Sequence, residues 1–135
     1  MEDQIRYIGS TAFKSSSGGQ DGAPITSFVT PVSVYGIGSK AFYQCINLTA
    51  ILVHSGITTY GNDIFIYTSS LSNVFFYNKT NDTFYTGLKT DNSITQGSTE
   101  ITATSSPTLD EMAAYFGDDA AAGKAYIASL GYTVW

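Results

Sequence analysis

The sequence predicts a β-rich solenoid of about three repeats, each of roughly 23 residues, followed by a small C-terminal α+β cap. The first observation behind this prediction is a six-residue phrase at 8–13 that returns almost unchanged at 37–42 and, degraded, at 60–65. The spacing of the last two copies, which begin at positions 37 and 60, sets the period. An internal period of this size is typical of solenoids. The second observation is that helix signals appear only after the repeats end.

A second repeated segment extends each unit. Residues 48–53 recur one period later at 71–76, and their earlier counterpart is 25–30. Within each copy the apolar positions follow one spacing, as expected of strands that stack in register. The first unit carries an insertion at 14–24, which is rich in Ser and Gly and is predicted to be a surface loop.

The repeated apolar positions predict ladders of side chains inside the coil. One repeat cannot bury its apolar face alone, so neighbouring repeats must supply the other side. The three ladders expected are Phe13/Phe42/Phe65, Ile25/Leu48/Leu71 and Phe28/Ile51/Val74. Gly9, Gly38 and Gly61 recur where the chain must turn sharply, and we expect them to provide positive φ angles there.

Residues 37–51 read IGSKAFYQCINLTAI. This stretch resembles the BspA-like leucine-rich repeat, whose unit contains Ile-Gly-x-x-Ala-Phe-x-x-Cys-x-x-Leu-x-x-Ile. The next unit departs from the pattern, with Tyr60, Ile64 and Thr68 in place of Ile, Ala and Cys. The resemblance covers about residues 5–77. It implies a leucine-rich-repeat fold and a role in adhesion or recognition, and leaves residues 78–135 unplaced.

The C-terminal region begins with a predicted hairpin. Residues 74–77 and 84–88 have strand patterns around a turn at 78–82, and 92–104 alternates loosely with a turn expected at 97–98.

Two short helices are predicted next. Thr108 and Glu111 form a capping box, Gly117 is expected to end the first helix, Asp118 to cap the second and Gly131 to close it. Residues 132–135 alternate like a terminal strand. We expect residues 78–135 to cap the open end of the repeats at 1–77, as one compact unit.

Composition excludes several classes of partner. The net charge is −5, with only 6 Lys and Arg residues, so a nucleic-acid partner is not expected. No apolar run is long enough to span a bilayer, so membrane insertion is not expected. The N-terminal stretch MEDQIRYIGS has neither the basic start nor the apolar segment of a secretory signal.

No catalytic constellation is evident, so we expect a protein that is not an enzyme and needs no cofactor or metal. Cys45 is the only cysteine and is interpreted as a small buried hydrophobe. His54 is the only histidine and is interpreted as an exposed residue at a variable position.

The acidic pairs at 110–111 and 118–119 are explained by helix capping. Residues 78–82 could offer oxygen ligands to Ca²⁺ but are better explained as a hairpin turn. Glycosylation sequons begin at Asn47, Asn78 and Asn81, and matter only if the protein is secreted.

The outward side of the strands carries the partner-binding candidates. Alternate side chains of a strand point to opposite faces, so one set should face away from the coil. These candidates are Val29, Leu52, Phe75, Pro31, His54 and Tyr77. An apolar stripe that faces outward is expected to be covered by other protein side chains. The cover is either another protein chain or the C-terminal region of this one, and we expect the former, because the C-terminal region already has the open end to cover.

These observations predict a structural or protein-interaction component of a larger assembly. Its most favoured setting is a virion, as a decoration, fibre or attachment protein, because a surface adhesin needs export and no secretory signal is seen. The alternative, which the resemblance suggests, is a cell-surface adhesion or recognition module of a secreted bacterial protein. In both settings the partners are other protein chains.

Overall fold

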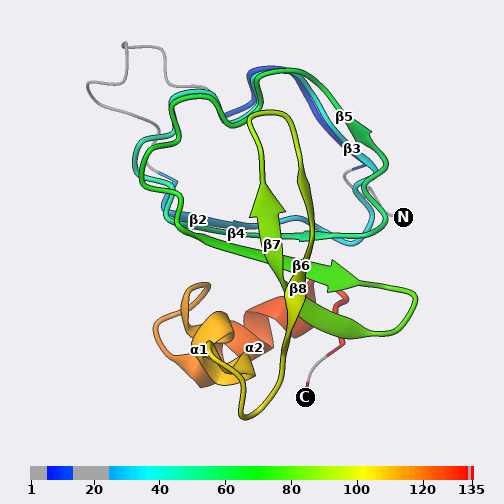
Figure 1. Cartoon of the computed structure of the whole chain (residues 1–135), viewed down its shortest axis with the longest axis vertical. Coiled ribbons are helices and arrows are strands. Elements are labelled where there is room, and N and C mark those ends of the chain that lie inside the picture. Colours follow the sequence, from blue (N-terminus) through cyan, green and yellow to red (C-terminus); the bar gives the residue numbers. More distant parts are fainter. Residues whose placement is uncertain (1–5, 14–24, 134) are drawn as a thin grey trace.

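A computed structural model describes residues 6–13, 25–133 and 135; the surface loop expected at 14–24 lies outside them. Two groups of parallel strands lie on opposite sides of the repeated part of the chain, and two helices lie against one of them (Figure 1). The first group is a three-stranded sheet, and the second begins a five-stranded sheet.

The small sheet joins the Ile-Gly phrases. It consists of β1 (Tyr7–Ile8), β3 (Gly36–Ile37) and β5 (Thr59–Tyr60), all parallel. Ile8 is opposite Ile37, and Ile37 is opposite Tyr60. The predicted alignment of these three phrases is therefore confirmed.

The larger sheet carries the second repeated segment. Its first three strands are β2 (Ser27–Val29), β4 (Ala50–His54) and β6 (Asn73–Asn78), again parallel. Each strand pairs with its counterpart in the next repeat, so that Val29 lies opposite Leu52 and Leu52 opposite Phe75. The register thus follows the period of the sequence, and it sends every second side chain into the space between the two sheets.

That space holds one hydrophobic core, with the expected aromatic ladder at its centre. The Phe42 ring stacks on Phe13 at a centroid distance of 5.1 Å and on Phe65 at 5.8 Å, with interplanar angles of 12° and 7°. Phe42 and Phe65 are fully buried, whereas Phe13 at the end of the ladder is only half-buried. The ladder is therefore confirmed, and its first ring, Phe13, also packs against Phe28 at a centroid distance of 5.2 Å.

None of the recurring glycines has the expected positive φ, and only Gly38 and Gly61 lie close to the preceding repeat. Among the described residues the left-handed conformation occurs two positions later, at Thr11 (φ 60°), Lys40 (φ 59°) and Asp63 (φ 57°), and Gly131 is the one glycine that adopts it. A Cβ added at Gly61 would lie 2.3 Å from the backbone nitrogen of Ser39 in the preceding repeat. Glycine is therefore needed here for close approach of neighbouring backbones, and not for a positive φ.

After the repeats, a hairpin extends the larger sheet. Strand β7 (Thr83–Lys89) pairs antiparallel with β6, which confirms the predicted hairpin, and β8 (Ile94–Ile101) pairs antiparallel with β7. The turn expected at 97–98 is wrong, because both residues lie within β8. A Cβ at Gly97 would lie 2.6 Å from the Thr86 carbonyl oxygen, near a register shift in the β7–β8 pairing. Strand pairing at this close approach overrides the local turn propensity.

The helices begin and end close to where the sequence predicts. Helix α1 (Leu109–Ala114) starts with the Thr108–Glu111 capping box, and Gly131 follows α2 (Ala120–Ser129) with φ 96°. The α2 cap is Asp119, whose side chain accepts from the Ala122 N–H at 2.9 Å, so the assignment to Asp118 is off by one. No strand is present in the described part of 132–135.

The C-terminal region covers two different surfaces. The β7–β8 hairpin pairs with the free edge of β6, as expected of a cap. The helices α1 and α2 instead lie on the outer face of the larger sheet (Figure 1). A second hydrophobic core forms between that face and the helices. The expectation that the whole segment covers the open end is therefore corrected.

Candidate functional site

The outward-facing stripe is buried by the chain itself. Val29, Leu52 and Phe75 retain only 2 %, 0 % and 2 % of their surface exposed. They belong to the second core, together with Met112 of α1 and Ile127 of α2. Their direction, away from the first core, is as predicted. The expected cover is wrong, because the chain's own helices occupy this face and no partner chain can reach these side chains in this structure.

Of the second row of candidates, His54 and Tyr77 pack against Tyr132, whereas Pro31 is only partly buried. The Tyr132 ring packs edge-on against His54 and Tyr77, at centroid distances of 5.8 Å and 5.2 Å. Its hydroxyl donates to the Thr30 carbonyl oxygen. The residues after α2 therefore complete the cover that the helices begin.

His54 is fully buried, so the interpretation of an exposed histidine is wrong. Its Nδ1 accepts from the Gly56 N–H at 3.0 Å, and its Nε2 lies 2.9 Å from the Pro31 carbonyl oxygen. An N–H donor on one side and a carbonyl acceptor on the other assign the neutral tautomer protonated on Nε2. Burial lowers the pKa of His54 below 6.5, the Pro31 carbonyl partly offsets this, and Lys79 lowers it further. His54 is thus a structural histidine that links neighbouring repeats.

Cys45 is fully buried and its thiol donates to the Phe13 carbonyl oxygen at 2.9 Å. Burial raises the pKa of the thiol to about 11. A buried thiol that stays protonated at neutral pH is a weak nucleophile. The interpretation as a small buried hydrophobe is confirmed, and the weak thiol hydrogen bond adds a contact to the preceding repeat.

The acidic residues at the start of α1, and Asp119 at the start of α2, are engaged in local structure. Glu111 accepts from the Thr108 N–H at 2.8 Å in the capping box, and Asp110 accepts from the Trp135 Nε1–H at 3.0 Å. Asn78 forms an Asx-type turn by accepting from the Thr80 N–H at 2.9 Å, which agrees with a hairpin turn. Across residues 6–13, 25–133 and 135, no three His, Cys, Asp or Glu side chains gather as a metal site. No helix in the same part of the chain could span a membrane.

Exposed aromatic side chains remain on the repeated part of the chain, in addition to Tyr115 and Tyr126 in the helical region. Tyr7 and Tyr35 are 45 % and 49 % exposed, and their ring centroids are 6.1 Å apart beside the small sheet. Tyr67 is 63 % exposed and meets the edge of Tyr43 at 5.5 Å. The sequence analysis did not predict these pairs. A usable signal was present, because each of these tyrosines lies one or two positions before or after a copy of the repeated phrase.

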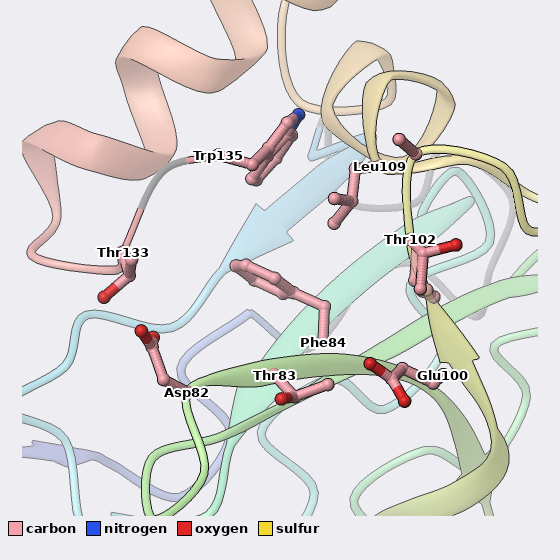
Figure 2. Close-up of a pocket in the computed structure, with 10 residues that line it drawn as sticks. Asp82, Thr83, Phe84, Glu100, Thr102, Leu109, Thr133 and Trp135 are labelled. Carbon is pink, nitrogen blue, oxygen red and sulfur yellow. The ribbon is translucent and has the colours of Figure 1, made fainter.

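A pocket of about 230 Å³ lies where the hairpin, the start of α1 and the C-terminal residues meet (Figure 2). Phe84 forms its floor and Trp135 stands over it, at a centroid distance of 5.5 Å and an angle of 78°. Asp82 and Glu100 lie on opposite sides of Phe84. The other lining residues are Thr83, Ile101, Thr102, Ala103, Leu109 and Thr133.

Asp82 is held in place at one end of this pocket. The Tyr77 hydroxyl donates to its carboxylate, and also lies 3.3 Å from the Thr133 hydroxyl. Hydrogen bonds from Tyr77 and Thr133 lower the pKa of Asp82, so the carboxylate stays ionised at neutral pH. Burial and the adjacent carboxylate raise the pKa of Tyr77, which therefore keeps its proton.

A family model matches residues 1–102, and its description is "BspA type Leucine rich repeat region (6 copies)". The match covers about three quarters of the chain (102 of 135 residues), so the chain belongs to the BspA-type leucine-rich repeat family. It extends beyond residue 77, where the resemblance in the sequence ended, and includes the β7–β8 hairpin. No curated protein and no solved structure matches the chain. The family suggests a protein-interaction or surface module.

Proposed function

We propose that this protein is a non-catalytic, protein-interaction component of a larger assembly. The chain forms a short solenoid of three stacked coils, which serves as a rigid scaffold whose outer face is already filled by its own helices. Binding therefore uses the surfaces that the helices leave open.

The observation that carries this proposal is the pair of exposed tyrosine contacts. Tyr7 with Tyr35, and Tyr67 with Tyr43, place aromatic rings on the repeated part of the chain. Tyrosine is enriched at protein interfaces because it offers a large, rigid contact area and a polar hydroxyl at low entropic cost. Lys40 lies 5.4 Å from the Tyr43 ring centroid, which adds a positive charge to the second pair.

The surroundings of the two residues with catalytic potential also support a non-enzymatic role. His54 is locked between two backbone groups, and the Cys45 thiol stays protonated. Neither offers a free lone pair or proton to a substrate. The variants His54→Ala and Cys45→Ser should therefore keep the biological activity, provided that they fold. A folded variant of either residue that loses activity would overturn the non-catalytic assignment.

We propose a virion as the assembly, with the chain as a decoration, fibre or attachment protein. The alternative is a cell-surface adhesion or recognition module, for which family membership is the supporting observation. Both settings require a scaffold with exposed aromatic contacts, so the location separates them better than the binding chemistry does.

The test is to locate the protein by quantitative mass spectrometry in the source organism. Purified virus particles and protease-shaved cell surfaces are compared with whole-cell lysate. Enrichment in particles supports the virion, and enrichment in the shaved fraction supports the surface module. A protein that is enriched in neither fraction and elutes as a free monomer from the native extract would overturn the proposed role in an assembly.

A further inference from the structure

We propose that the pocket between Phe84 and Trp135 binds a lysine or arginine side chain of a partner protein. The proposal rests on the proposed function as a protein-interaction component and names the chemistry that one contact recognises. This pocket lies on the C-terminal side of the molecule and shares no residue with the exposed tyrosine pairs.

The walls of the pocket suit the aliphatic stem of such a side chain. Phe84 and Ile101 are 5 % and 2 % exposed, and form a fixed apolar floor. The Trp135 ring stands nearly perpendicular to Phe84. Leu109 projects from the start of α1 on the same side as Trp135 (Figure 2). Lysine and arginine bury their methylene stems against surfaces of this kind while their charged heads stay near water.

The charged groups of the pocket are both negative. Asp82 lies at one side and Glu100 at the other, and no Lys, Arg or His is among the lining residues. Neither carboxylate forms an ion pair with any residue that the structure describes. Phe84 and Ile101 point to one face of the sheet, whereas Glu100 lies opposite Tyr85 and belongs to the other face. A cation beside Phe84 would therefore meet the Asp82 carboxylate directly and Glu100 only at longer range, and an anion would be repelled. The net charge of −5 also favours a basic partner over an acidic one.

Trp135 is already oriented to accept a cation on its ring. Its indole N–H donates to the Asp110 carboxylate, which fixes the plane of the ring. The Lys124 ammonium lies 5.3 Å from the ring centroid and 3.4 Å from the same carboxylate. Lys124 does not line the pocket. The molecule therefore shows one cation–π contact on this indole, and the pocket offers the same ring together with the Asp82 carboxylate.

The size of the pocket limits what it can hold. A volume of about 230 Å³ is below the roughly 300–1,000 Å³ of pockets that take drug-sized ligands. It accommodates one long side chain and not a folded peptide segment. The contact would thus be a single anchor within a larger interface.

The test uses Trp135 as an internal probe, because it is the only tryptophan in the chain. The parent protein is titrated with acetyl-Gly-Gly-Arg-Gly-Gly-amide, with the Lys peptide in place of Arg, and with the neutral Gln peptide. We expect a saturable change in tryptophan fluorescence with a Kd on the order of 1 mM for both basic peptides, since one side chain makes all the contacts. The Gln peptide should give no saturable change. Raising the salt from about 0.05 M to 0.5 M should weaken binding, because the carboxylates are exposed.

Substitutions separate the pocket from general charge attraction. Asp82→Asn should raise the Kd about threefold, because it removes the charge and keeps an oxygen that can accept from the Tyr77 hydroxyl. Asp118→Asn removes one exposed carboxylate that does not line the pocket, and should leave the Kd unchanged. Equal responses to the Arg and Gln peptides, or the same loss of affinity for Asp118→Asn and Asp82→Asn, would overturn the proposal. Such a result leaves the role in an assembly standing, because enrichment in particles or on cell surfaces does not depend on this peptide.

Discussion

Leu52 is the most informative position for testing whether the helices cover the outer face of the sheet. It is fully buried on the strand between Val29 and Phe75, and all three side chains lie in the core shared with α1 and α2. Leu52→Ala removes most of the side chain from a packed site and leaves a cavity there. Leu→Ala changes of this kind cost about 2–5 kcal/mol in the free energy of unfolding.

The expected loss lies in the upper part of that range, at about 3–4 kcal/mol, because the site is bounded by a sheet on one side and helices on the other and can collapse little. For a domain of this size, that loss lowers the melting temperature by roughly 10–14 °C. Leu88 provides a matched control: it is also a strand leucine, but its side chain is 58 % exposed. Leu88→Ala should change the free energy of unfolding by less than about 0.5 kcal/mol.

Thermal and urea unfolding, followed by circular dichroism on the isolated monomer, measure both variants against the parent. Size-exclusion chromatography confirms that the samples are monomeric. If Leu52→Ala melts within about 2 °C of Leu88→Ala, the outer face is not covered by the chain's own helices. The cover would then have to come from a partner, and the internal core described above would be wrong.

Three further predictions concern the repeats themselves. Phe42→Ala removes the middle ring of the aromatic ladder and should cost roughly 3–5 kcal/mol in urea unfolding; a parent-like midpoint would contradict the ladder. Gly61→Ala should cost about 1–3 kcal/mol, because its Cβ meets the preceding repeat, whereas Gly9→Ala has nothing within 4 Å and should be neutral; equal effects would contradict the close-approach argument. The pKa of His54 is lower in the folded state than its ordinary value of 6.5, so its contribution to stability is complete above about pH 6.5 and is lost as the pH falls toward the folded pKa. Melting temperatures between pH 7.5 and pH 5.5 should therefore fall more steeply for the parent than for His54→Gln, and parallel profiles would show that His54 is not buried in the neutral form.

The repeat register could be predicted from the sequence because one period determines it. Because the apolar residues have identical spacing in successive units, only one alignment buries all of them. A slip by one residue would move the buried side chains of each strand to the opposite face of the sheet. The ladder through Phe42, the inward position of Cys45 and the capping box at Thr108 all follow from short-range patterns of this kind.

The reason for the glycines could not be predicted from local sequence. A glycine that provides a positive φ and a glycine that permits close approach look the same in one chain. At Gly61 the deciding fact is the distance to Ser39, which belongs to the preceding repeat and is a neighbour only once the repeats have stacked. Gly97 was misassigned for the same reason, because its neighbour Thr86 belongs to another strand.

The sequence by itself determined the repeat, its family and the fact that Leu52 faces away from the inner core. Only the tertiary structure decided what covers Leu52. The choice between the chain's own helices and another protein depends on where α1 and α2 dock, which no local pattern encodes. The free energy of apolar burial is proportional to the area buried and has no directional preference. An apolar stripe therefore predicts that it is covered, but not which segment or protein covers it. The same limit applies to the pocket at Trp135, whose walls come from segments that meet only in the folded chain.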